Sequence, residues 1–150
     1  MGSSEIALKL PDATKQSLGT ITQANQRYHI ALAQTLLRVG KLMADYAKQE
    51  TARGPRGGSV FLPRKYGAHV PVSAPGEPPQ YRTGFLQNSI GWTLEDGGVK
   101  LFDTAPYASF LEDGTDNIEQ RPFLAPAQQQ GCALLPVIGQ QEMDKAWRAK

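Results

Sequence analysis

The chain has 150 residues, of which 40% are hydrophobic and 20% are charged, and its formal net charge is only +2. This length fits one domain with a modest core, and a charge balance this close to neutral argues neither for nor against a nucleic-acid partner. The single cysteine excludes an intramolecular disulfide framework. No stretch approaches the roughly 20 apolar residues of a membrane-spanning helix, and the first residues lack the pattern of a signal peptide. We therefore expect one soluble domain over residues 1–150.

The strongest periodic pattern predicts a long helix from about Asp12 to Glu50. Asp12 follows Pro11 and suits the N-cap position. Gly19 and Gly40 each weaken a helix by about 1 kcal/mol relative to alanine, so the pattern leaves open whether the helix is continuous. Apolar residues recur every three or four positions, which places them on one helix face. The residues of this predicted face are Ile21, Ala24, Tyr28, Leu32, Leu36, Val39, Met43 and Tyr46.

Residues 52–84 hold the excess of Pro and Gly, with 12 of the 26 such residues in the chain, and are too long for an ordinary connection between two elements. The segment is therefore either disordered or an extended arm. It contains five basic residues and one acidic residue, whereas residues 85–150 contain five basic and nine acidic residues. A basic arm of one subunit can dock on an acidic surface of another. The candidate interface residues of the arm are Arg53, Arg56, Phe61, Arg64, Lys65, Tyr66 and Arg82.

A β-hairpin is predicted after the arm. Residues 89–94 alternate between polar and apolar, residues 95–98 read Glu-Asp-Gly-Gly, and residues 99–102 form the return strand. Ile90, Trp92 and Leu94 share one face of the first strand. A short helical turn is expected just before the hairpin, over residues 83–88.

Two helices are predicted in the last third of the chain. The first runs from Pro106, which suits the first helical position, to Leu111. Gly114 is expected to stop it, with a positive φ. We expect it to place Tyr107, Phe110 and Leu111 against the sheet. The second begins near Pro126 after Arg121 and Pro122, with Phe123 and Leu124 as anchors, and Pro136 is expected to kink or split it.

Together these elements predict an α+β fold. In this fold a long N-terminal helix and a C-terminal helix pack on a small antiparallel sheet, and a long Pro/Gly-rich arm extends from them.

Groups that support catalysis are scarce in this sequence. His29 lies just off the apolar face of the long helix, and His69 lies in the arm, so neither has a partner at metal-ligand spacing. Cys132 stands among small and apolar residues and is interpreted as buried. Glu112 and Asp113 are adjacent and do not face each other in a helix, which favours a surface pair at a helix end. We predict no enzymatic activity, no cofactor and no metal.

One constellation resembles a known family. Residues 104–115 read Thr-Ala-Pro-Tyr-Ala-Ser-Phe-Leu-Glu-Asp-Gly-Thr, and residues 121–127 read Arg-Pro-Phe-Leu-Ala-Pro-Ala. This order closely resembles the neck and tail-completion family of tailed bacteriophages with long flexible tails, the siphophages. The family's pattern is Pro-Tyr-Ala, a short gap, Leu-Glu-x-Gly-Thr, and Arg-Pro-Phe-Leu leading into a C-terminal helix. The signature residues are Pro106, Tyr107, Ala108, Leu111, Glu112, Gly114, Thr115, Arg121, Pro122 and Phe123.

The resemblance extends upstream, so that it covers residues 73–127. Residues 73–79 look like the family's Pro/Gly-rich stretch, and residues 83–90 are similar to its Gly-x-Leu-x-x-Ser-Ile. The chain departs from the family in its last helix, which contains Pro136 and few charges before Glu142, whereas the family's helix is usually charged and unbroken.

The resemblance implies a structural virion protein that forms a cyclic homo-oligomer, with six-fold symmetry favoured over twelve-fold. The ring would lie at the head–tail junction or at the head-proximal end of the tail tube, next to the head–tail adaptor and the major tail tube protein. DNA would pass through its lumen without sequence-specific binding, and assembly would take place in the cytoplasm of the bacterial host.

Two other classes remain as alternatives. A nucleic-acid-binding module would use the basic arm at residues 53–82, where Arg and Lys residues alternate with aromatic residues. A small hydrolase would need a cluster of His, Cys and acidic residues that the sequence does not show.

Overall fold

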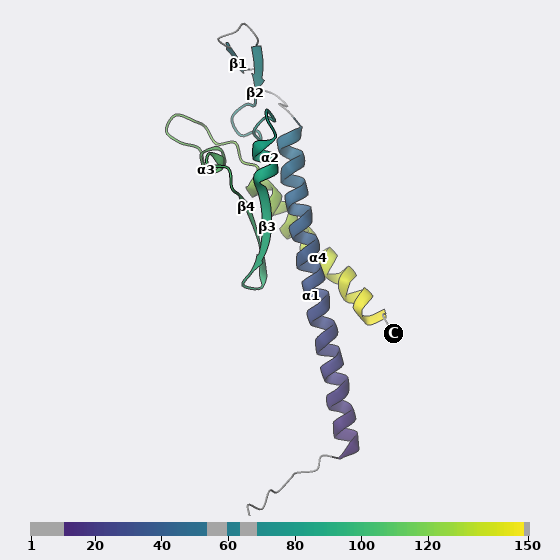
Figure 1. Ribbon diagram of the computed structural model, residues 1–150. Coiled ribbons are helices and arrows are strands. Elements are labelled where there is room, and N and C mark those ends of the chain that lie inside the picture. Colours follow the sequence, from purple (N-terminus) through teal and green to yellow (C-terminus); the bar gives the residue numbers. More distant parts are fainter. Residues whose placement is uncertain (1–10, 54–59, 64–68, 149–150) are drawn as a thin grey trace, which may run out of the picture.

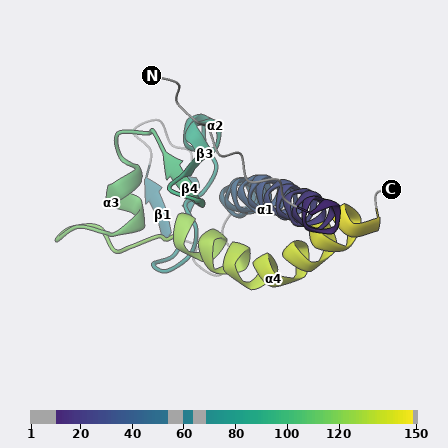
Figure 2. The ribbon, with the colours of Figure 1, turned by 90° about the horizontal axis from the view of Figure 1, so that it is seen from below.

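Two helices and a β-hairpin form the framework of the protein. The computed structural model describes residues 11–53, 60–63 and 69–148. Helix α1 (Asp12–Ala52) is continuous, helix α4 (Leu124–Arg148) packs along part of it, and the hairpin of β3 (Ile90–Glu95) and β4 (Gly98–Asp103) also packs on α1 (Figure 1). Figure 2 shows α4 and the hairpin on different sides of α1. The predicted α+β fold is thereby confirmed.

The remaining elements are short. Within the predicted arm, β1 (Val60–Pro63) and β2 (His69–Val72) pair antiparallel as a second hairpin, near the C-terminal end of α1 (Figure 1). Helix α2 (Phe85–Ser89) is the short turn expected before β3. Helix α3 (Ala108–Glu112) begins two residues after Pro106. The prediction that Pro106 is the first helical residue was therefore wrong, because the backbone becomes helical only after Tyr107.

The predicted apolar face of α1 is buried only toward the C-terminal half of the helix, since none of residues 12–30 is buried. Val39 and Met43 are buried as expected, but Ile21 is 64% exposed and Tyr28 is 48% exposed. Small side chains fill most of the contact instead, since they allow another element to approach the helix backbone closely. The buried residues of α1 are Ala31, Thr35, Val39, Gly40, Met43, Ala44, Ala47, Glu50 and Thr51.

Gly40 marks the closest approach of the hairpin to α1. The Trp92 indole lies directly over it, so that a Cβ atom at Gly40 would clash with the ring. Trp92 is opposite Leu101 in the antiparallel register, and the hairpin turns at Asp96 and Gly97 with φ of 50° and 75°. Two consecutive positive φ angles are typical of the type I′ turn, whose twist matches that of the strands. The hairpin was predicted correctly, turn included.

Replacing glycine by alanine is expected to have opposite effects on stability at the two glycines of α1, Gly19 and Gly40. Gly19→Ala is expected to stabilise the helix by about 1 kcal/mol, because alanine is the better helix former and the added Cβ meets nothing within 4 Å. Gly40→Ala is expected to lower the free energy of unfolding by about 1–3 kcal/mol, because the indole has to move. Hydrogen exchange for the first variant and denaturant unfolding for the second measure these effects. A gain in stability for Gly40→Ala would contradict the close contact.

Helix α4 begins at Leu124, two residues earlier than predicted, and continues through Pro136 to Arg148 without a split. It follows a curved path past α1 (Figure 2). Gly131 of α4 faces Met43, and Cys132 is consequently turned outward and exposed. The interpretation of Cys132 as a buried residue was wrong, because the adjacent glycine occupies the contact position. None of the helices in the described part of the chain is long and apolar enough to cross a membrane.

Candidate functional site

Hydrogen bonds join the Pro/Gly-rich stretch at residues 73–79 to the signature segment at residues 104–127, the two parts of the region that carries the family resemblance. The Arg121 guanidinium donates from Nε and Nη2 to the Ser73 carbonyl oxygen, at 3.3 and 3.1 Å. The backbone N–H of Gly76 donates to the Gln120 carbonyl oxygen at 2.9 Å. The Pro/Gly-rich stretch at residues 73–79 is thus attached to the segment that leads into α4, although more than forty residues separate them.

A second set of contacts attaches the start of the signature to the α2–β3 junction. The Ser89 hydroxyl donates to Asp103 Oδ1 at 2.7 Å, and the same oxygen accepts the backbone N–H of Ala105, also at 2.7 Å. The N–H of Thr104 donates to the Ser89 carbonyl oxygen at 3.2 Å. Asp103 therefore fixes the point at which the chain leaves the hairpin.

Glu112 caps the N-terminus of α4 from another helix. One carboxylate oxygen accepts the N–H groups of Phe123 and Leu124 at 2.9 and 3.0 Å, and the other accepts that of Ala125 at 2.8 Å. These are among the backbone donors that have no partner within their own helix, and a negative charge at this end is stabilising. The interpretation of Glu112 and Asp113 as a surface pair was wrong for Glu112, which is half-buried.

The loop between α3 and α4 depends on Gly114. Its φ is +78°, as predicted, and a Cβ atom there would lie 2.9 Å from the Ile118 carbonyl oxygen. Thr115 and Ile118 pair as an isolated β-bridge, with the N–H of Thr115 donating at 2.8 Å. Glycine is needed both for the left-handed backbone and for the close approach of the returning chain.

The other signature residues divide into core and surface. Phe123 is fully buried, Ala108 is 5% exposed, and Leu111 packs against the same cluster. Pro122 is half-buried and Pro106 is exposed. Tyr107 and Phe110, which we expected against the sheet, are 41% and 53% exposed, because the short α3 turns Ala108 and Leu111 inward instead.

An open pocket of about 340 Å³ lies beside α2, where both parts of the resembling region meet. We call it the α2 pocket. Tyr81, Phe85 and Tyr107 contribute exposed aromatic rings to it, and the Phe85 and Tyr107 rings lie 6.2 Å apart. Gln80 Oε1 is buried there and accepts no hydrogen bond within the described part of the chain. No sequence pattern marked this pocket, since its lining comes from four separate segments.

The predicted interface residues of the arm are mostly beyond the described part of the chain. Arg53 is exposed and donates to Glu50 Oε1 at 2.8 Å, and Arg82 lines the α2 pocket. Arg56, Arg64, Lys65, Tyr66 and the side chain of Phe61 lie outside the described residues.

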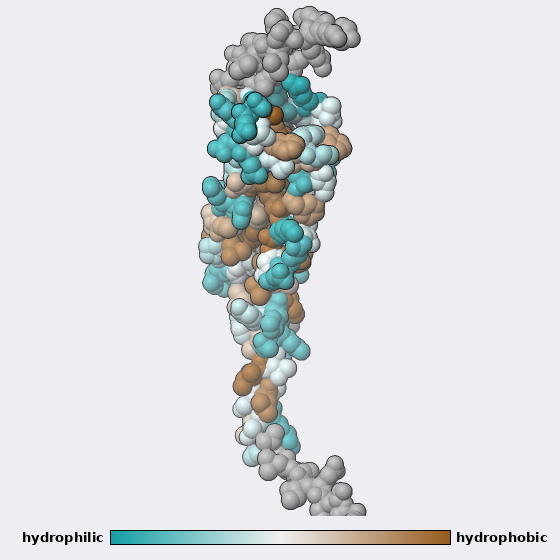
Figure 3. All heavy atoms as spheres, turned by 90° about the vertical axis from the view of Figure 1, so that its left-hand side faces the viewer, coloured by the Kyte–Doolittle hydropathy of each residue, from teal (hydrophilic) through white to brown (hydrophobic). Residues whose placement is uncertain are grey.

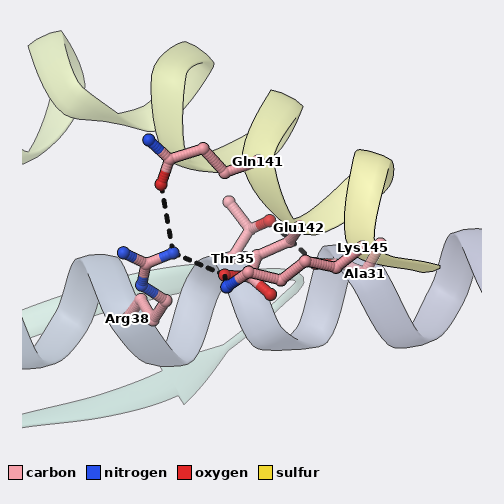
Figure 4. Close-up of polar contacts among 6 residues, drawn as sticks. All are labelled: Ala31, Thr35, Arg38, Gln141, Glu142 and Lys145. Carbon is pink, nitrogen blue, oxygen red and sulfur yellow. Dashed lines mark hydrogen bonds and ion pairs between the residues drawn. The ribbon is translucent and has the colours of Figure 1, made fainter. Parts of the chain in front are cut away.

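A polar cluster between α1 and α4 was not foreseen from the sequence. Arg38 of α1 donates to Gln141 Oε1 at 3.3 Å and forms an ion pair with Glu142, which also pairs with Lys145 at 2.8 Å (Figure 4). The hydrogen bond from Lys145, followed by that from Arg38, holds the pKa of Glu142 below its ordinary value. The cluster fixes the register of α4 along α1, since it joins residues more than a hundred positions apart.

Acidification is expected to weaken this contact. Because the pKa of Glu142 is lower in the folded chain than in the unfolded one, its contribution is complete above the ordinary glutamate pKa of about 4.3 and is lost as the pH falls through the folded-state value. Glu142→Gln should flatten the dependence of the thermal midpoint on pH between about pH 5 and pH 3. Glu119→Gln, at an exposed loop position, serves as the control, and equal flattening in both variants would contradict the assignment.

The described residues contain no group of three or more His, Cys, Asp and Glu side chains that could hold a metal ion. His29 is exposed, and its ring contacts that of Tyr28 edge-on at 5.7 Å. No family model, no curated protein and no solved structure matches the chain. The candidate site is the α2 pocket, whose lining includes the hydrogen-bonded pair of Arg121 and Ser73.

Proposed function

We propose that the chain is a structural virion protein of a tailed phage, which forms a ring at the head–tail junction or at the head-proximal end of the tail tube. Its partners are copies of itself in a closed ring, with six subunits favoured over twelve, and the adjoining head–tail adaptor and tail tube proteins. DNA passes through the lumen without sequence-specific contacts.

The observation that carries this proposal is the role of the residues behind the family resemblance. Arg121, Gly114, Glu112 and Phe123 each hold one part of the resembling region against another, through the contacts described above. Residues that build a scaffold are expected in a protein whose surfaces and shape are its function. An enzyme would instead need groups that converge on a reacting atom.

The distribution of exposed hydrophobic residues also supports assembly. Ile21 on the N-terminal half of α1 and Phe85 and Phe110 near the other end of the molecule are all more than half exposed. Figure 3 shows hydrophobic residues both on the wider upper part of the molecule and on the lone helix below it. Two unlike patches at separate places favour heterologous contacts, which form a ring when the rotation between neighbouring subunits closes.

Electron microscopy of the purified chain tests the proposal. We expect closed rings with an axial channel, and an increase in the yield of joined particles when they are added to heads or tails that lack this protein. A chain that stays monomeric at high micromolar concentration, or rings that join neither heads nor tails, would contradict it.

The alternative function is DNA binding through the basic arm at residues 53–82. It rests on the excess of basic residues there. A gel shift over a series of salt concentrations separates the two, because contacts to phosphate groups give an affinity that falls steeply with salt. Tight, salt-sensitive binding by the monomer would favour the alternative.

A further inference from the structure

The loop between α3 and α4 is acidic and largely exposed. Asp113, Asp116 and Glu119 lie in it, and it contains no basic residue. None of the three carboxylates forms an ion pair or a hydrogen bond within the described part of the chain. Figure 2 shows the loop extending away from the rest of the molecule. We call residues 113–120 the acidic loop.

The tip of the acidic loop is held in one shape by its own hydrogen bonds. The N–H of Thr115 donates to the Ile118 carbonyl oxygen at 2.8 Å, and the N–H of Ile118 donates to the Thr115 carbonyl oxygen at 3.2 Å. Asp116 and Asn117 therefore form the turn between them. A loop that is already shaped in this way loses little conformational entropy when it binds a partner. It presents Ile118, which is 41% exposed, next to the acidic side chains.

The α2 pocket has the opposite charge. Its lining contains Arg82 and Arg121 and no acidic residue. Arg82 is exposed and has no hydrogen-bond or ion-pair partner within the described part of the chain. Arg121 uses Nε and Nη2 on the Ser73 carbonyl oxygen, which leaves Nη1 without an acceptor among the described residues. Because the rings of Phe85 and Tyr107 lie beside these charges, the pocket suits a ligand that carries carboxylates and an apolar side chain.

The acidic loop does not enter the pocket of its own chain. None of residues 113–120 lines the α2 pocket, although Arg121 follows the loop directly. The N–H of Gly76 donates to the Gln120 carbonyl oxygen at 2.9 Å, and the loop borders a separate open groove together with Pro75 and Gly76. This attachment holds the base of the loop outside the pocket. A contact between the loop and the pocket therefore involves two molecules.

We propose that the acidic loop of one copy of this chain docks in the α2 pocket of a neighbouring copy. In this contact the loop carboxylates pair with Arg82 and Arg121, and Ile118 packs against the exposed aromatic rings. Opposite charges on the two surfaces favour their encounter in the correct orientation, and arginine and aromatic residues are enriched at protein interfaces. The inference rests on the proposed ring function and names its subunit contact, because each copy uses one loop and one pocket.

Charge reversal on each surface tests the contact. Arg82→Glu in the pocket and Asp116→Lys in the loop are each expected to weaken self-association about tenfold or more, because each substitution places like charges opposite one another. Arg148→Glu and Asp45→Lys make the same changes of charge at exposed positions outside the loop and the pocket. These controls should assemble like the original chain. Sedimentation velocity gives the assembly state, and circular dichroism confirms that each variant is folded.

Mixing the two altered chains gives the sharpest test. The acidic loop of the Arg82→Glu chain still fits the basic pocket of the Asp116→Lys chain. The new lysine in the loop of the second chain in turn faces the new glutamate in the pocket of the first. Each variant alone should therefore assemble poorly, whereas the mixture should regain assembly with the two chains alternating.

The outcomes separate this inference from the ring function. Rings formed by each variant alone as readily as by the original chain, or a mixture that regains no assembly, would overturn the docking of the loop and leave the ring function intact. A pocket that serves a different partner gives the first of these results. Failure of the unaltered chain to assemble would overturn both.

Discussion

Phe123→Ala is expected to lower the free energy of unfolding by about 3–5 kcal/mol. Phe123 is fully buried, and the other buried members of its cluster are almost all alanines: Ala44, Ala47, Ala105, Ala108 and Ala127, with Ile90 as the exception. Phe123 is thus the one fully buried aromatic ring of this cluster, and partly buried side chains such as Trp92 and Leu111 pack against the cluster from outside. Alanines have no rotamers with which to fill the cavity that its removal leaves, so the loss should fall in the upper part of the range.

Urea unfolding of three variants measures this effect. Phe123→Leu keeps most of the apolar volume and should lose about half as much stability as the alanine variant. Phe110→Ala removes a ring that is 53% exposed and should lose less than about 1 kcal/mol. Similar losses at Phe110 and Phe123 would contradict the position of the core.

The local pattern of the sequence was enough to predict α1 and the β3–β4 hairpin, but not the pairing of β1 with β2 inside the arm. The alternation at residues 89–94 and the turn residues Asp96 and Gly97 determine the β3–β4 hairpin, because the turn requires positive φ angles that few residues adopt. Gly114 signalled the end of α3 for the same reason. The long helix was predicted from its apolar periodicity, and α1 continues through both Gly19 and Gly40.

Contacts between distant elements were the part that the sequence did not predict. Periodicity places Ile21 and Tyr28 on the same helix face as Val39 and Met43. Helix α4 packs on Val39 and Met43, and the hairpin packs on Gly40, but none of residues 12–30 is buried, so that Ile21 and Tyr28 stay exposed. A glycine or alanine gives no signal of a contact until its partner, here Trp92, is placed over it.

The candidate site shows the same limit in its polar contacts. Glu112 was interpreted from its neighbour Asp113, yet its partners are backbone groups of α4, and backbone donors leave no trace in a sequence. The α2 pocket was missed because its lining residues come together only through the contacts of Arg121 with Ser73 and of Gly76 with Gln120.

Glu112→Ala is the substitution in which this scaffold role is most directly measured. It is expected to lower the free energy of unfolding by about 2–3 kcal/mol, because three backbone N–H groups at the start of α4 lose a charged acceptor. Glu112→Gln keeps acceptor capacity without the charge and should lose about half as much. Asp113→Ala, next to it and exposed, should change stability by less than about 0.5 kcal/mol.

Hydrogen exchange locates the effect. In the Glu112→Ala protein the amides of the first turn of α4, over residues 124–128, should exchange faster than in the original chain. The exchange rates of the β3–β4 hairpin amides should change only as much as the change in global stability requires. Loss of protection spread evenly over the chain would show that Glu112 supports the fold in some way other than as a cap. Phe123 is both a partner of Glu112 and a buried member of the core cluster. The variant that carries both Glu112→Ala and Phe123→Ala should therefore lose less stability than the sum of the two single losses.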